Sequence, residues 1–209
     1  MDWLLLATGF NGALTLLFLL RALYRRVATP PSVSAVFSPK GGCTDTVLRE
    51  LKAARREVLV QAYSFSSKPI AEALVDARMR GLKVEILLDR SNEQETYSDL
   101  KFFVDQGLTP LVDAQHAIAH NKLIIIDRAT LLTGSFNFTH QAENENAENL
   151  IIIKHHHDLI QAYRANFAAH KAHCKQPQPR AAAPAAPQRR THEVPVAGHV
   201  TAEPRKHAA

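Results

Sequence analysis

The sequence predicts an α/β fold in which a mixed β-sheet is flanked by helices, as one domain preceded by a transmembrane helix. Three observations lead to this prediction. Short aliphatic runs alternate with amphipathic helical segments in the order βαβαβα up to residue 107, and several further strands then follow one another. The chain is 209 residues long, which suits a single domain with appendages. An uncharged apolar run stands at the N-terminus.

The first half of the chain alternates between the two periodicities. Helix 43–56 places Val47 and Leu51 on one face, and helix 69–81 has Pro69 in its first turn and Gly81 at its end. The predicted elements are, in order, strand 34–37, helix 43–56, strand 57–65, helix 69–81, strand 83–89 and helix 95–107.

The second half is dominated by strands. "DRAT" at 127–130 reads as a tight turn, so the strands on either side of it are expected to form a hairpin. No internal repeat is visible in this half or the first. The predicted elements are strands 109–113, 122–127, 130–134 and 149–153, followed by a last helix over 158–173.

The N-terminal run predicts a single-pass membrane anchor. Trp3–Leu20 is just long enough to span a bilayer, and the arginines that follow it place the domain in the cytoplasm by the positive-inside rule. The alternative is export to the periplasm or secretion, because "VSA" at 33–35 resembles a cleavage site. The predicted organisation is anchor 1–26, linker 27–33, catalytic domain 34–175 and a disordered Pro/Ala-rich tail 176–209.

Charge and cysteines restrict the function classes only weakly. The net charge of +5 belongs to the ends, because residues 32–175 contain 17 basic and 17 acidic side chains. A basic composition is therefore no argument for a nucleic-acid groove in the domain. Cys43 and Cys174 form no disulfide framework and lie in no metal-binding spacing, so both are expected to be ordinary thiols.

Reactive polar side chains occur within the predicted hairpin. His120 and Lys122 are two residues apart and share a face of a strand, as do Ser135 and Asn137 after Gly134, which relieves crowding. Asp127 points the other way or ends its strand. An imidazole, an ammonium, a hydroxyl and an amide are thus brought to one end of the sheet, and phosphoryl transfer requires such a nucleophile beside anion-binding donors.

The spacing His120-x-Lys122-x4-Asp127-x6-Gly134-Ser135-x-Asn137 resembles the HKD motif of the phospholipase D superfamily. The flanking segments resemble its single-motif branch, which includes Nuc-type endonucleases and mitochondrial cardiolipin hydrolases (Zucchini proteins). The resemblance covers about residues 34–170 and implies the phosphodiesterase sandwich fold of that superfamily.

The resemblance also implies a two-step reaction through a phosphohistidine, with two motifs facing each other. A single motif per chain implies a homodimer with one composite site. The other His-x-Lys, at residues 173–175, lacks the rest of the motif. A neutral His120 would attack phosphorus while the partner's His120, protonated, would donate to the leaving oxygen.

The remaining motif residues receive supporting roles from the same resemblance. Lys122 and Asn137 would hold the non-bridging phosphate oxygens, with Ser135 hydrogen-bonded nearby. Glu148 in "NAEN" matches the acidic residue that orients the nucleophilic imidazole. Asp127 is expected to fix the strands rather than to touch substrate. No metal or other cofactor is required.

Three functions are compatible with these residues. The leading prediction is an endonuclease that hydrolyses nucleic-acid phosphodiester bonds without metal. The second is cleavage of membrane phospholipid by the same chemistry, as a phospholipase D or cardiolipin hydrolase. The third, a non-catalytic nucleic-acid-binding dimer, is disfavoured because binding needs no nucleophile. "HHH" at 155–157 is interpreted as a solvated junction between strand and helix, and Tyr63 as a strand or core residue.

Overall fold

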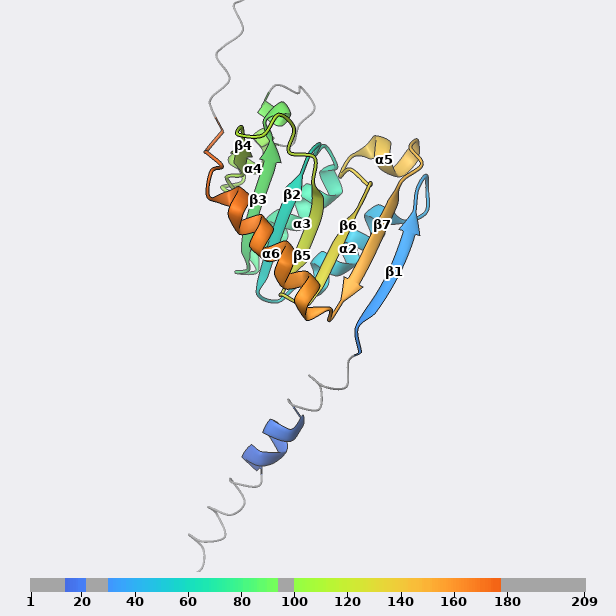
Figure 1. Ribbon diagram of the computed structural model, residues 1–209, viewed down its shortest axis with the longest axis vertical. Helices are drawn as coiled ribbons and strands as arrows, with labels where there is room; N and C mark the ends of the chain where they lie inside the picture. Colours follow the sequence, from blue (N-terminus) through green and yellow to red (C-terminus); the bar gives the residue numbers. More distant parts are fainter. Residues whose placement is uncertain (1–13, 22–29, 94–99, 178–209) are drawn as a thin grey trace, which may run out of the picture. The chain divides into compact units, whose positions relative to one another are not determined.

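A computed structural model describes residues 14–21, 30–93 and 100–177 of the chain. Its centre is one seven-stranded sheet with the order β1-β7-β6-β5-β2-β3-β4 (Figure 1). β2–β3 and β3–β4 are parallel pairs and the other neighbours are antiparallel, which makes the sheet mixed. The strands are β1 (Ser32–Phe37), β2 (Glu57–Ala62), β3 (Lys83–Asp89), β4 (Leu111–Asp113), β5 (Lys122–Ile126), β6 (Thr130–Gly134) and β7 (Asn149–Lys154).

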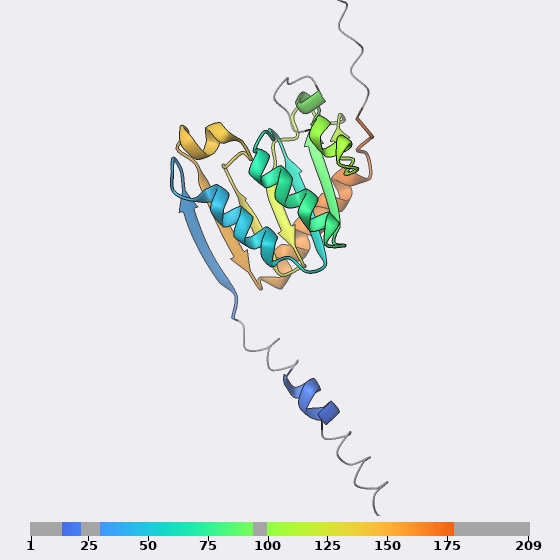
Figure 2. The same ribbon diagram turned by 180° about the vertical axis from the view of Figure 1, so that it is seen from behind.

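Helices cover both faces of the sheet. α6 crosses the face that is turned to the viewer in Figure 1, and α2, α3 and α4 cover the opposite face, seen from in front in Figure 2. The predicted flanked mixed sheet is therefore confirmed. The helices are α2 (Cys43–Ala53), α3 (Lys68–Met79), α4 (Leu100–Asp105), α5 (His140–Asn144) and α6 (His157–Lys171), with a 3-10 turn, η1, at Arg90–Glu93.

Two hydrophobic layers fill the space between sheet and helices. Along β5, Leu123 and Ile125 belong to the layer beneath α6, whereas Ile124 and Ile126 belong to the layer beneath α2 and α3. All four side chains are at most 4 % exposed. A strand that is buried on both faces reads as a continuous apolar run, which is why the triple isoleucine carries no alternation.

The tight turn between β5 and β6 forms as the sequence predicts. Asp127 and Arg128 both have positive φ, and Ala129 N donates to the carbonyl of Ile126. Ile126 pairs with Thr130, so the loop of the hairpin is residues 127–129. The Asp127 carboxylate accepts hydrogen bonds of 2.7–3.0 Å from the backbone amides of residues 55–57. Asp127 thus ties the chain entering β2 to the hairpin turn.

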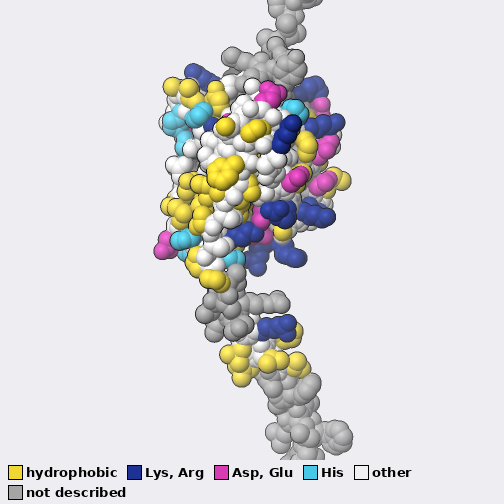
Figure 3. Space-filling view, turned by 90° about the vertical axis from the view of Figure 1, so that its right-hand side faces the viewer, with side chains coloured by type: hydrophobic (Ala, Val, Ile, Leu, Met, Phe, Trp, Pro, Cys, Tyr) yellow, Lys and Arg dark blue, Asp and Glu magenta, His cyan; other side chains and the backbone are white. Residues whose placement is uncertain are grey.

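β1 forms one edge of the sheet and pairs with β7. It begins at Ser32, two residues inside the segment predicted as linker. Figure 3 faces this edge and shows hydrophobic side chains at the surface among charged ones. Val33 and Phe37 of β1 are each more than half exposed.

Several element boundaries differ from the prediction. β2 ends at Ala62 instead of residue 65, because the chain turns into a loop held by Asn92, whose amide contacts the backbone of Tyr63 and Phe65. The short helix α5 was not predicted; Thr139 Oγ1 caps it by accepting from Ala142 N. Within the predicted helix 95–107, residues 95–99 lie outside the described residues and α4 forms the rest.

The predicted membrane localisation is wrong by the present structure. Within the described part of the chain, no helix is long and apolar enough to cross a membrane. The anchor prediction rests on Trp3–Leu20, of which residues 3–13 lie outside the described residues and 14–20 belong to a helix over 14–21. The predicted tail, beyond residue 177, also lies outside the described residues.

Candidate active site

The motif residues meet at one edge of the sheet because of the strand directions. β5 and β7 run antiparallel to β6, so the start of β5, the end of β6 and the start of β7 lie side by side. His120 and Lys122 stand at the start of β5, Ser135 follows β6 and Glu148 precedes β7. The structure therefore brings together, at the upper edge of the sheet in Figure 1, residues that are up to 28 positions apart in sequence.

His120 and Lys122 are in direct contact. Lys122 Nζ lies 3.2 Å from His120 Nε2 and donates to the His120 carbonyl at 3.1 Å. Tyr63, at the end of β2, packs against both: its ring centroid is 4.5 Å from that of His120 and 5.2 Å from Lys122 Nζ. Tyr63, interpreted as a strand or core residue from the sequence, therefore packs against both the imidazole and the ammonium of the site.

Lys122 is buried although it carries a charge, with only 7 % of its surface exposed. Burial lowers its pKa from the ordinary lysine value, and the negative charge of Glu148 acts in the opposite direction. Burying an ammonium group costs free energy unless an anion pairs with it. This environment suits a side chain whose function is to meet a phosphate oxygen.

Ser135 and Asn137 follow the end of β6, and Ser135 contacts Asn149 of β7. Ser135 Oγ accepts hydrogen bonds from Asn149 N at 3.0 Å and Asn149 Nδ2 at 3.2 Å. Asn137 Oδ1 is buried and has no hydrogen-bond partner among the described residues. Oδ1 is an acceptor and cannot bind a phosphate oxygen, so the group that Asn137 could offer to a phosphate is its Nδ2 amide. Asn149 is the supporting residue that the sequence pattern did not indicate.

Gly134 is required by the close approach of β6 to β7. A Cβ atom at this position would lie 2.3 Å from the Asn149 carbonyl oxygen and 2.7 Å from Asn149 Oδ1. The backbone φ of +151° is also one that other residues rarely adopt. Glycine therefore lets β6 approach β7 closely enough for Asn149 to donate hydrogen bonds to Ser135.

Gly134→Ala is expected to destabilise the fold by about 3 kcal/mol or more and to lower the Tm by about 6 °C or more, because backbone must move. Thermal and denaturant unfolding measure the change. Gly81→Ala is the matched control: its φ is +87°, but no atom lies within 4 Å of the added Cβ, so we expect a loss of about 1 kcal/mol. Equal losses in the two variants would contradict the contact with Asn149.

Glu148 lies at the edge of the sheet that carries the motif, and Asp127 lies at the opposite edge. Glu148 lies close enough to act on Lys122 electrostatically, and its Oε1 accepts from Asn146 Nδ2 at 3.1 Å. Among the described residues, no hydrogen bond joins Glu148 to His120. Asp127 stands at the opposite end of β5 from Lys122, where it binds backbone amides.

The loop before His120 is fastened by a buried carboxylate. Asp89, 3 % exposed at the end of β3, accepts a hydrogen bond of 2.7 Å from Ala119 N. Arg90 Nη2 contacts the carbonyl of Ala117 in the same loop at 3.4 Å. Asp89 thus holds the residue next to the imidazole, and its place at the end of a strand is the only sequence signal that could have indicated it.

The cysteines do not supply a nucleophile. Burial, with the charges of Glu143 and Glu148, raises the pKa of Cys43 to about 11. Burial and the charge of Asp113 raise the pKa of Cys174 to about 11. Both side chains are free thiols and remain protonated at neutral pH.

A cavity of about 350 Å³ lies beside the motif, between the start of α2, the start of α3 and α5. Ser66 and Ser67 N both donate to the carbonyl of Phe138, one residue after Asn137, so the cavity and the motif share a wall. The cavity is lined by Thr44, Asp45, Ser66, Ser67, Lys68, Pro69, His140, Glu143 and Asn144.

Comparisons of sequence give a consistent family. The family model described as "Cardiolipin synthase, PLD-like domain" matches residues 47–171. The chain is 43 % identical over 141 residues to "Phospholipase D" of Rickettsia typhi, covering 68 % of this chain and 69 % of the relative. It is 31 % identical over 108 residues to "Mitochondrial cardiolipin hydrolase" of Mus musculus, covering 52 % of this chain and 49 % of that protein.

Comparisons of structure agree with those of sequence. The phospholipase D family member Nuc from Salmonella typhimurium superimposes with a TM-score of 0.68 at 32 % identity, over 70 % of this chain and 98 % of Nuc. NucT from Helicobacter pylori has the same fold, with a TM-score of 0.65 at 21 % identity, over 70 % of this chain and 99 % of NucT.

Proposed function

This chain belongs to the phospholipase D superfamily of phosphodiesterases, and from that membership we propose that it hydrolyses nucleic-acid phosphodiester bonds without a catalytic metal. One observation carries the proposal: His120 Nε2 lies 3.2 Å from the Nζ atom of the buried Lys122. A nucleophile is thus placed beside the cation that would receive the phosphate oxygens. A protein that only binds nucleic acid has no use for that pairing.

The reaction proceeds in two displacements at phosphorus. His120 Nε2 attacks, the N–P bond forms, the P–O bond to the leaving group breaks, and the leaving oxygen takes a proton from the partner's His120. Water then attacks the phosphohistidine, the N–P bond breaks, and the proton returns to the partner's His120. Lys122 and the Asn137 amide stabilise the charge on the non-bridging oxygens in both steps.

The acid for the first step comes from a second copy of the chain. The one HKD motif supplies a single imidazole, and an imidazole that attacks phosphorus cannot also be the acid in the same displacement. Ile118, two residues before His120, is 59 % exposed, so a substitution there can test an interface next to the site without disturbing the core. A two-fold axis beside His120 would bring the two imidazoles together.

Glu148 and Ser135 complete the proposed site. Glu148 supplies negative charge close to Lys122, and its proposed role is to orient the imidazole. Ser135 fixes the segment that carries Asn137 through its two bonds to Asn149. Asp127 and Gly134 support the hairpin rather than the substrate.

The cavity beside the motif offers groups that could hold the backbone of a nucleic acid. Ser66, Ser67 and Lys68 line it with hydroxyl and ammonium groups, next to the carboxylates of Asp45 and Glu143. The Glu143 carboxylate is engaged by the backbone amides of Gly42 and Thr44. Hydroxyl and ammonium groups contact phosphate and sugar oxygens without reading sequence. A strand passing from His120 over this cavity would therefore be held by its backbone, which fits cleavage with little sequence preference.

Phospholipid is the second candidate substrate. The relatives at 41–44 % identity are named phospholipase D, and the reacting phosphodiester is common to both substrate classes. Cleavage of a phospholipid would use the same His120, Lys122 and Asn137. The two candidates therefore differ in what binds beside the motif and not in the chemistry.

The test is incubation of purified protein with plasmid DNA, single-stranded RNA and cardiolipin vesicles, each with and without excess EDTA. We expect cleavage of nucleic acid that persists in EDTA, because Lys122 and Asn137 supply the charge stabilisation that a metal would otherwise give. Circular dichroism recorded alongside separates a loss of folding from a loss of catalysis. Activity that is lost in EDTA while the protein stays folded, and returns with a divalent ion, would contradict the mechanism.

A further inference from the structure

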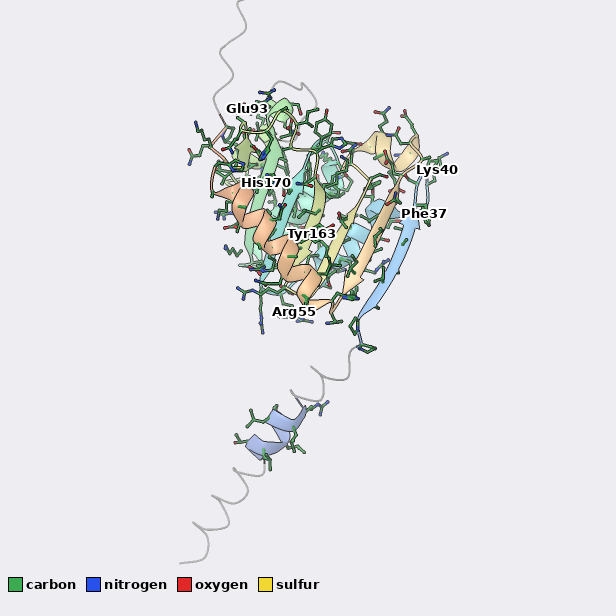
Figure 4. The ribbon with its side chains drawn as sticks, viewed as in Figure 1. Phe37, Lys40, Arg55, Glu93, Tyr163 and His170 are labelled. Atoms are coloured by element: carbon green, nitrogen blue, oxygen red, sulfur yellow. The ribbon has the colours of Figure 1, made fainter. Side chains whose placement is uncertain are left out.

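Four metal-ligating side chains that the catalytic mechanism does not use converge at the end of β4. Asp113 closes β4, and His116 lies in the loop that follows it. His170 lies in the last turn of α6 and His173 two residues after the helix ends, more than fifty residues later. Figure 4 shows His170 at the end of α6 that lies beside β4.

The three imidazoles meet at one oxygen atom. Asp113 Oδ2 lies 2.8 Å from His170 Nδ1, 3.0 Å from His116 Nδ1 and 3.2 Å from His173 Nε2. One possible ligand atom from each of the four residues lies within 4.8 Å of the others. Tetrahedral zinc with bonds of 2.0–2.1 Å holds its ligand atoms about 3.3 Å apart, so ligand atoms that now lie up to 4.8 Å from one another would move closer on binding.

The framework around the cluster is already ordered. Asp113 is 1 % exposed, and its other oxygen, Oδ1, accepts from Gln115 N at 3.1 Å and His116 N at 3.4 Å. Val112 and Lys175 exchange two backbone hydrogen bonds, of 2.7 and 3.0 Å, which join β4 to the segment after α6. Outer hydrogen bonds that orient the first ligands are characteristic of metal sites in proteins.

We propose that Asp113, His116, His170 and His173 bind one Zn²⁺ ion in a closed, four-coordinate structural site. Three nitrogens and one carboxylate oxygen are borderline ligands that suit zinc and leave no open position for substrate. None of the four residues belongs to the HKD motif. The ion therefore takes no part in phosphoryl transfer and does not alter the proposed reaction.

The site would hold the loop that precedes the catalytic histidine. His116 lies four residues before His120, in the loop that Asp89 already holds through Ala119 N. His170 comes from α6, which packs on the hydrophobic layer that contains Leu123 and Ile125. Zinc would thus join the loop before the nucleophile to the end of α6, next to the Val112–Lys175 pair that joins β4 to the segment after α6.

The experiment uses the purified full chain. Zinc content is measured by mass spectrometry, the chelator-treated protein is titrated with ZnCl₂ by calorimetry, and CoCl₂ is used to report coordination by visible absorption. We expect one Zn²⁺ per chain, a four-coordinate Co²⁺ spectrum, and a Tm that rises by about 5–10 °C at one hundred times Kd.

Variants distinguish this cluster from other histidines. H170Q/H173Q should lose zinc binding, and H116Q, at a partly exposed loop position that spares the core, should weaken it at least about 100-fold. H156Q/H157Q removes surface histidines at the opposite end of α6 and should bind as wild type does, as should H120A. Zinc bound equally by H116Q and wild type, or no binding to wild type at about 100 μM Zn²⁺, would overturn the proposal.

Discussion

Replacing His120 with alanine is expected to lower phosphodiester hydrolysis by at least about 10⁴-fold, because no other side chain can form the covalent intermediate. The variant should fold normally. His120 precedes β5, and its ring contacts Tyr63 and Lys122 at the edge of the sheet, outside both hydrophobic layers. Loss of activity with an unchanged Tm therefore separates catalysis from stability.

The measurement is the initial rate on whichever substrate the wild type cleaves, together with mass spectrometry of enzyme quenched in alkali during turnover. Wild type should carry a phosphoryl adduct on His120, and H120A should carry none. His157→Ala is the matched control, because His157 is an exposed histidine at the start of α6 and should keep the wild-type rate. Substantial activity in H120A would exclude the phosphohistidine.

The fold could be predicted because its local signals agree with one another. The apolar run of β5 and the turn at Asp127 lie in a hairpin with the predicted ends, within one residue. The exceptions have physical causes. β2 stops early because Asn92 holds the loop after it, and α5 forms because Thr139 caps a segment too short to show a helical period.

The motif residues could be placed near one another from spacing alone, since residues two apart on a strand share a face. The residues that surround and support the motif could not be predicted in this way. Asp89 reaches Ala119 across thirty residues, and Asn149 holds Ser135 across fourteen. These contacts depend on strand order, which local periodicity does not determine.

The histidine cluster shows the same limit more sharply. "HHH" at 155–157 is conspicuous in the sequence, yet the structure places it at the junction of β7 and α6, as predicted. The histidines that converge are His116, His170 and His173, and they do so because α6 returns across the sheet to β4. The spacings Asp113-x2-His116 and His170-x2-His173 were the available signals, and each is too short to be specific on its own.

Mixing wild-type and H120A chains is expected to give less activity than the wild-type fraction alone would supply. If each site needs His120 from both chains, hybrid dimers are inactive, and an equal mixture that has exchanged subunits retains about one quarter of the wild-type activity rather than one half. The prediction follows from the proposed composite site, in which one imidazole attacks while the other donates a proton. It is sensitive because the H120A chain is otherwise intact and competes fully for partners.

The experiment co-refolds the two chains at several ratios and measures rate and mass in solution by light scattering. Activity should fall as the square of the wild-type fraction while the mass stays that of a dimer. Ile118→Asp supplies the second test: a charge on this 59 % exposed side chain should weaken the interface without touching the core, so activity should fall as the protein is diluted. A linear dependence on the wild-type fraction, or an active monomer, would show that one chain holds a complete site. The proton for the leaving group would then have to come from within the same chain, and among the residues at this edge Lys122, 3.2 Å from Nε2 with its pKa lowered by burial, is the donor that the geometry offers.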